Sequence, residues 1–176
     1  PGSRLQNTML IRNALTQIIS KYQIKTMLDI PCGDFNWMQK MDLSQVSYTG
    51  MDIVSDLIKS NTMNFGGDNR KFMVADLVED KLPKSDLVFC RDCLVHLSFK
   101  DIQAALANMK RSQSTYLLAT SFTDHSNFDI VTGNWRQINL QASPFNLPRP
   151  LEVFNEGEPG ENNDKSMALW HLQDLP

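Results

Sequence analysis

The hydrophobic positions near the start of the chain recur at helical spacing. They are Ile11, Ala14, Leu15, Ile18, Ile19 and Tyr22. Because residues three and four apart share one face of a helix, this pattern predicts an amphipathic helix within residues 1–23. Asn7 or Thr8 is the candidate cap, since either side chain can accept a hydrogen bond from a free backbone amide of the first turn.

Short apolar runs replace the helical pattern after this helix. Five of them predict buried strands, at residues 26–30, 48–53, 72–75, 87–90 and 116–120. Two helical faces lie between them, one with Leu57 and Ile58 and one with Ile102 and Leu106; Ser98 and Asp101 resemble a capping box for the second. This alternation predicts a doubly wound, mostly parallel α/β sheet.

The pattern breaks after Phe122. Residues 121–150 are rich in Asn, Pro and isolated aromatic residues, and an aperiodic stretch of this length is usually functional. Two later runs, 151–154 and 167–172, predict the last strands as an antiparallel hairpin. The polar, glycine-containing residues 155–165 predict a loosely held hairpin tip.

Composition and charge narrow the function classes. The chain has 176 residues and a net charge of −3, with no basic run, so we expect no nucleic-acid partner. No apolar stretch approaches the ~20 residues that span a bilayer, so we expect no membrane association.

Three cysteines, Cys32, Cys90 and Cys93, lie in or beside apolar segments, which predicts a reducing, cytoplasmic location. Because the chain starts at Pro1 without an initiator Met, we expect a processed or excised piece.

Acidic residues follow the first three predicted strands. Asp29, Asp52 and Asp76 stand at the three strand ends, and Gly33 lies in the turn after the first. Ligands of open α/β sheets bind beyond the carboxyl ends of the strands, where these acids should converge. Asp52 follows Asp29 by 23 positions, where a carboxylate that binds ribose hydroxyls belongs.

The acids beside Gly33 distinguish between cofactors. A dinucleotide site receives a pyrophosphate on backbone amides, and Asp29 and Asp34 would repel that group. The turn also lacks the G-x-G-x-x-G spacing, so a nicotinamide-dependent oxidoreductase is disfavoured. S-adenosylmethionine (SAM) carries an ammonium and a sulfonium, which carboxylates stabilise and to which Phe35 or Trp37 could add a cation–π contact. We therefore expect SAM and S-adenosylhomocysteine to bind and NAD not to bind.

The same segments resemble a known family. Residues 27–35, Met-Leu-Asp-Ile-Pro-Cys-Gly-Asp-Phe, resemble motif I of class I SAM-dependent methyltransferases. Residues 50–53 resemble the ribose-binding acid of that family, residues 74–77 its adenine-contacting acid, and residues 86–97 its fourth motif and the short helix that follows. The resemblance implies a Rossmann-like, seven-stranded sheet whose last strand is antiparallel.

Two departures from the family pattern change the expectation. Pro31 and Phe35 stand where the family usually has glycines, so the detailed path of the loop is expected to differ from that of the family. The Asn/Asp-Pro-Pro-aromatic signature of amino-methylating nucleic-acid enzymes is absent after the fourth strand. We therefore expect a small-molecule acceptor.

The site residues follow from the residue pattern and the resemblance together. The expected cofactor contacts are Asp29, Pro31, Cys32, Gly33, Asp34, Trp37, Asp52, Ile53, Asp76, Leu77 and Arg91. Asp92 or His96 would accept a proton if the acceptor must lose one; the alternatives are a solvated Arg-Asp pair and a hydrogen-bonded imidazole. Asp124, Trp135 and Arg136 are candidates for acceptor binding, or else belong to a solvated loop. The cysteines and histidines form no complete set of zinc ligands at the usual spacing, so no metal is expected.

The expected organisation is one methyltransferase domain over residues 1–176. It comprises the N-terminal helix at 1–23, a cofactor-binding core at 25–120, an acceptor-binding loop at 121–150 and the terminal hairpin at 151–176. We expect the loop to act as a lid over the acceptor. The alternative function is a catalytically silent module that binds SAM or its product as a partner or sensor.

Overall fold

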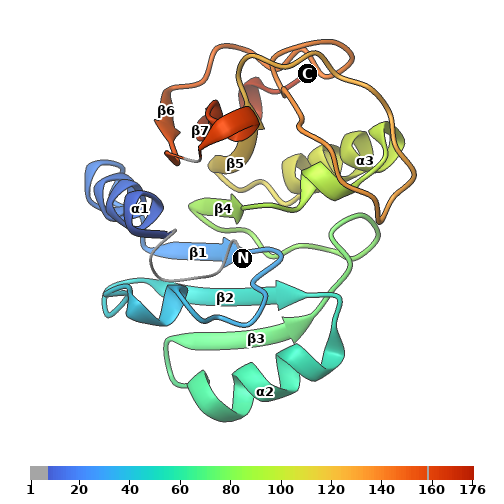
Figure 1. Ribbon diagram of the computed structural model, residues 1–176. Coiled ribbons are helices and arrows are strands. Elements are labelled where there is room, and N and C mark those ends of the chain that lie inside the picture. The colour runs from blue at the N-terminus through green and yellow to red at the C-terminus, as the bar shows by residue number, and fades with distance from the viewer. Residues whose placement is uncertain (1–7, 158) are drawn as a thin grey trace.

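The computed structural model describes residues 8–157 and 159–176, in which seven strands form one sheet. The strand order is β3-β2-β1-β4-β5-β7-β6, and Figure 1 shows the first four stacked in that order. All neighbouring strands pair in parallel except at β7, which runs antiparallel to both β5 and β6. The doubly wound sheet with its terminal antiparallel hairpin is therefore confirmed. The strands are β1 Thr26–Asp29, β2 Ser47–Asp52, β3 Arg70–Val74, β4 Leu87–Cys90, β5 Tyr116–Phe122, β6 Glu152–Asn155 and β7 Lys165–His171.

Three α-helices accompany the sheet in the described part of the chain: α1 Met9–Lys21, α2 Ser55–Phe65 and α3 Phe99–Arg111. The first helix buries the face predicted from its periodicity, and Thr8 stands at its N-cap position, but the Thr8 side chain does not make the predicted capping hydrogen bond. Asn7, the other candidate cap, lies outside the described residues. The capping role of Ser98 is confirmed, because its hydroxyl accepts a hydrogen bond from the Asp101 amide at 3.2 Å.

Two hydrophobic clusters cover the sheet. One joins α1, α2 and the β1–β2 connection to the strands, and it includes Phe35, whose ring packs against the rings of Tyr48 and Phe72. The other joins α3 to β4, β5, β7 and the segment after β5. Phe35, at the place of a family glycine, thus belongs to the interior, and its expected cation–π role is not available. The β1–β2 connection carries a short 3₁₀ helix, Met38–Lys40.

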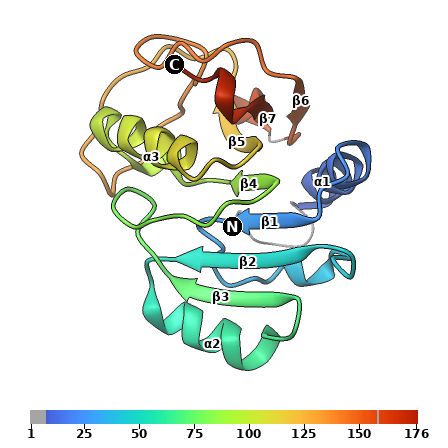
Figure 2. The same cartoon turned by 180° about the vertical axis from the view of Figure 1, so that it is seen from behind.

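The segment from 123 to 150, which was expected to act as a lid, contributes residues to the hydrophobic core. It wraps round α3 in both views (Figures 1 and 2), and four of its apolar residues are buried in the core: Ile138, Leu140, Phe145 and Leu147. The spacing of these residues matches neither helix nor strand, so periodicity did not reveal their burial. The part from 136 to 147 therefore packs as a structural part of the α3 face, whereas residues 123–135 are mostly exposed.

The hairpin tip at 155–165 also differs from expectation. Glu156, Asp164 and Lys165 are buried, and the Glu156 amide donates to the Lys165 carbonyl at 2.9 Å. Their charge predicts exposure, but Glu156 and Lys165 form ion pairs with residues at the end of β4, which is distant in sequence.

Among the residues that the structure describes, no helix is long and apolar enough to cross a membrane.

Candidate functional site

A cleft of about 490 Å³ opens beyond the carboxyl ends of β1 and β4. These strands are neighbours, while the chain continues from β1 to β2 on one side and from β4 to β5 on the other. This is the topological switch point at which open α/β sheets bind their ligands. The cleft is lined by Asp29, Pro31, Cys32, Gly33, Asp34, Trp37, Phe89, Arg91, Asp92, His96, Phe122, Trp135, Asn162 and Lys165.

The turn after β1 leaves its backbone open to the cleft. Gly33 has φ +54°, and no heavy atom lies within 4 Å of the place that a Cβ would take. Two hydrogen bonds hold the turn: the Cys32 amide donates to the Met51 carbonyl at 2.8 Å, and the Asn61 amide group donates to the Gly33 carbonyl at 2.7 Å. A ligand can therefore approach a rigid, side-chain-free stretch of backbone.

Asp29 is a buried acid at the inner end of this turn. The Tyr48 hydroxyl donates to its carboxyl at 2.5 Å. Burial raises the pKa of Asp29 to about 7, Asp52 adds to the rise, and the Tyr48 hydrogen bond and Arg91 oppose it. Because desolvation disfavours the ionised form, a cationic ligand group beside Asp29 would restore that form.

Asp52 shapes the turn from the neighbouring strand. Its carboxylate accepts hydrogen bonds from the amides of Gly33 at 3.0 Å and Val54 at 2.9 Å. Neither Asp52 nor the following Ile53 lines the cleft, although Ile53 is 64% exposed and offers an open apolar surface. Asp52 thus reaches the glycine turn through its contact with the Gly33 amide.

Asp76 and Leu77 lie further from the cleft than expected. The Asp76 carboxylate accepts from the Val78 amide at 2.8 Å, and Leu77 packs into the core. Neither residue lines the cleft. The structure gives both a local structural role, as a turn acid and a core side chain.

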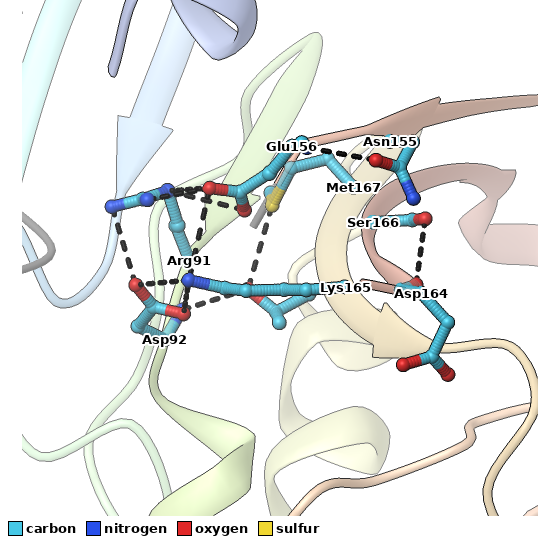
Figure 3. Close-up of polar contacts among 10 residues, drawn as sticks. Arg91, Asp92, Asn155, Glu156, Asp164, Lys165, Ser166 and Met167 are labelled. Atoms are coloured by element: carbon cyan, nitrogen blue, oxygen red, sulfur yellow. Dashed lines mark hydrogen bonds and ion pairs between the residues drawn. The ribbon is translucent and has the colours of Figure 1, made fainter. Parts of the chain in front are cut away.

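Four charged side chains form a network at one wall of the cleft (Figure 3). Arg91 donates from Nε and Nη2 to the Glu156 carboxylate, with the shortest contact at 2.5 Å, and its Nη1 lies 3.2 Å from Asp92. The Lys165 ammonium lies 2.9 Å from Asp92 and 3.7 Å from Glu156. Two cations and two anions therefore balance in a largely buried place.

Asp92 is the accessible member of this network. Its side chain is 32% exposed, against 6% for Arg91, 10% for Lys165 and 2% for Glu156. Asp92 has φ +54°, a left-handed conformation that Asp tolerates better than most residues, and its amide donates to the Thr120 hydroxyl at 2.8 Å. The bend turns the carboxylate toward the cleft.

His96 presents a defined nitrogen. Its Nδ1 lies 2.9 Å from the Asn134 carbonyl oxygen. A carbonyl only accepts hydrogen bonds, so Nδ1 is the donor, and in the neutral imidazole Nε2 is then the nitrogen with the free lone pair. Because His96 lines the cleft, the geometry is that of an imidazole held by one nitrogen with the other available as a base.

The three acceptor-binding candidates have different places. Trp135 lines the cleft and is half-exposed. Arg136 is buried, and its guanidinium donates to the carbonyls of Leu94, Leu97 and Phe128, so the acceptor role expected for it does not agree with the structure. Asp124 is exposed and does not line the cleft.

Sequence reasoning missed several cleft residues. Phe89, Phe122, Asn162 and Lys165 line the cleft, and Glu156 supports it through Arg91. Phe89 and Phe122 stand in or at the end of strands that were predicted, so their strand-end positions were a usable signal. Lys165 and Glu156 gave no such signal, because their partners lie 73 and 65 residues away.

The sequence matches the family model described as a methyltransferase domain over residues 27–114. The chain belongs to this methyltransferase family. The match spans the glycine turn, the acids at the strand ends and the β4 end, as the motifs predicted. A comparison with curated protein sequences finds no match.

Solved structures of methyltransferases share the fold at low sequence identity. The methyltransferase domain of bacterial CtHen1-C superposes with a TM-score of 0.71 at 12% identity, covering 96% of this chain and 98% of that one. The N-methyltransferase NodS from Bradyrhizobium japonicum WM9, in complex with S-adenosyl-l-homocysteine, has a TM-score of 0.67 at 15% identity over 92% and 85% of the two chains. Human N-acetylserotonin methyltransferase, in complex with SAM, has a TM-score of 0.63 at 13% identity over 96% and 59%. Family and fold together support SAM as the cofactor.

Proposed function

We propose that the chain transfers a methyl group from SAM to a small-molecule acceptor in the cleft beyond β1 and β4. The observation that carries the proposal is the pairing, within one cleft, of an acid-flanked glycine turn with an imidazole whose Nε2 is available as a base. The first feature suits a cationic cofactor, and the second suits an acceptor that must lose a proton.

The residues present suit SAM. Gly33 offers an open backbone, Asp29 and Asp34 offer negative charge, and the exposed Ile53 offers an apolar surface. Pro31, Cys32, Trp37 and Arg91 also line the cleft, and Asp52 holds the turn. When bound, the cofactor supplies an electrophilic methyl group on a sulfonium. The protein's own part is to align the acceptor and to keep its proton acceptor in place.

His96 is the better candidate for the base. Its Nε2 is not engaged by the Asn134 contact, whereas both oxygens of Asp92 already lie within 3.2 Å of Arg91 or Lys165 nitrogens. We assign proton removal to His96. To Asp92 we assign the role of a negative charge beside the acceptor. The three free thiols, Cys32, Cys90 and Cys93, suit a reducing compartment, so we place the enzyme in the cytoplasm.

Calorimetry tests the cofactor assignment. SAM and S-adenosylhomocysteine should each release or absorb heat on binding, and NAD should not. Binding of NAD without binding of SAM contradicts the proposal. Transfer of labelled methyl groups to a panel of small amines, alcohols and thiols tests the activity. His96→Gln should keep cofactor affinity and slow transfer at least ~100-fold, the usual contribution of a general base.

A further inference from the structure

The cleft has two ends of different character. The turn after β1 supplies the end that suits the cofactor. The other end, called the acceptor end here, is formed by Asp92, Phe122 and Lys165 at the ends of β4, β5 and β7, together with His96 after β4, Trp135 from the segment after β5 and Asn162 from the hairpin tip. The chemistry of these side chains restricts what can bind there.

The accessible charge at the acceptor end is negative. Asp92 is one-third exposed, while Lys165 and Arg91 are almost covered and face the carboxylates of Asp92 and Glu156. Figure 3 shows the Asp92 carboxylate between the Arg91 and Lys165 side chains. A ligand therefore meets a carboxylate in front of cations that are already paired.

An aromatic face accompanies this carboxylate. Trp135 is 49% exposed, and its ring stands edge to face with that of Phe122, with 6.4 Å between the centroids. Aromatic rings attract cations over their faces, and a carboxylate attracts them by charge, so the two groups together suit an ammonium. An anionic acceptor would instead have to displace Asp92 from both cations.

From this juxtaposition we infer that the acceptor is a cationic amine, bound as its ammonium between Asp92 and Trp135 and methylated on nitrogen. The inference rests on the proposed function, which it narrows to one class of acceptor. His96 supplies the step that an ammonium requires, because only the neutral amine has a lone pair to form a bond.

The atoms balance in two steps. The ammonium first gives one proton to His96 Nε2, which leaves a neutral amine and an imidazolium. The amine nitrogen then forms a bond to the methyl carbon as the carbon–sulfur bond breaks, and that electron pair stays on sulfur. The product nitrogen carries the positive charge, and His96, which is exposed, returns its proton to solvent.

The experiment compares three phenyl probes of similar size on the chain saturated with S-adenosylhomocysteine: 2-phenylethylammonium, 2-phenylethanol and phenylacetate. Calorimetry at low salt should show the ammonium binding at least ~10-fold more tightly than the carboxylate, with the alcohol between them. Tighter binding of the carboxylate overturns the inference, and so does absence of ammonium binding. Failure of S-adenosylhomocysteine itself to bind would instead overturn the proposed function.

Three variants locate the ammonium site. Asp92→Asn tolerates the left-handed backbone and should weaken the ammonium probe by roughly 10- to 100-fold, the range for a hydrogen bond to a charged group. Lys165→Met removes a cation and should preserve or strengthen binding. Unchanged ammonium affinity in a folded Asp92→Asn chain overturns the inference. If that variant fails to fold, half-exposed Trp135 decides: Trp135→Leu should weaken the ammonium more than the carboxylate.

Discussion

The two halves of the sheet, on either side of the β1–β4 junction, use polar side chains in different ways. In the β1–β3 half, acids accept hydrogen bonds from backbone amides: Asp76 from Val78 and Asp52 from Val54, each two positions away, and Asp52 also from Gly33, 19 positions away. In the β4–β7 half, charges pair across 65 and 73 residues, between Arg91 and Glu156 and between Lys165 and Asp92. The first half builds its binding turn from contacts that span at most 28 residues, whereas the second depends on the terminal hairpin being in place.

The largest expected effect breaks the long-range pairing. Arg91→Met should lower the free energy of unfolding by about 3–5 kcal/mol, because it leaves Glu156 buried without its main cation. Urea denaturation measures the change. Lys59→Met removes an ion pair that is largely exposed and should have little effect. Similar losses of unfolding free energy in the two variants would show that burial does not make the Arg91 ion pair more stabilising than an exposed one.

Arg136 gives the next largest effect. Arg136→Met should lower the free energy of unfolding by about 2–4 kcal/mol, because three carbonyls lose their donor. Trp135→Ala should change it by less than about 1 kcal/mol, because this ring is half-exposed. Thermal and urea unfolding of the pair separate a structural residue from its cleft-lining neighbour. Equal stability of the two variants contradicts this division.

Arg136 and the residues at strand ends show what could be predicted from the sequence and what could not. Strand ends carry a local signal, and Asp29, Gly33, Asp92 and His96, which were predicted at or after strand ends, all line the cleft. An arginine in an aperiodic loop carries none, because its partners are backbone carbonyls that only the fold brings together. Arg136 was therefore expected to bind an acceptor and instead anchors the loop.

The terminal hairpin makes the same point on a larger scale. Its strands were predicted within one or two residues, since apolar runs mark them. Its tip was expected to be loosely held, since Glu156 and Lys165 are polar. Their burial follows from ion pairs with the β4 end, and a pattern along one chain segment contains no information on such partners.

A substitution of Asp52 tests the β1–β3 half of the sheet. Asp52→Ala should weaken SAM binding by about 1–3 kcal/mol, because the turn amide of Gly33 loses its acceptor and the expected ribose contact is removed. Isothermal titration calorimetry measures the change. Asp56→Ala, an exposed acid in the first turn of α2, is the control and should leave SAM affinity unchanged. Unchanged affinity in a folded Asp52→Ala chain rejects the role of this acid.

The smallest effect concerns Asp29 and has opposite signs for stability and for binding. Burial raises the pKa of Asp29 from 3.8 to about 7 in the folded chain. The unfolded chain therefore releases this proton first, and the stabilising contribution, complete below pH 3.8, is lost as the pH rises toward 7. A cationic ligand group beside Asp29 favours the ionised form, so ligand binding improves over the same range.

We therefore expect SAM affinity to rise about tenfold, or about 1.4 kcal/mol, from pH 5.5 to pH 7, and then to level off as Asp29 becomes fully ionised. Calorimetry in buffers of different ionisation enthalpy should show a proton released on binding near pH 6. Asp29→Asn should bind SAM more weakly, with no rise over this range and no release of this proton. A rise of the same size in Asp29→Asn would assign the titration to another group and remove Asp29 from the cofactor site.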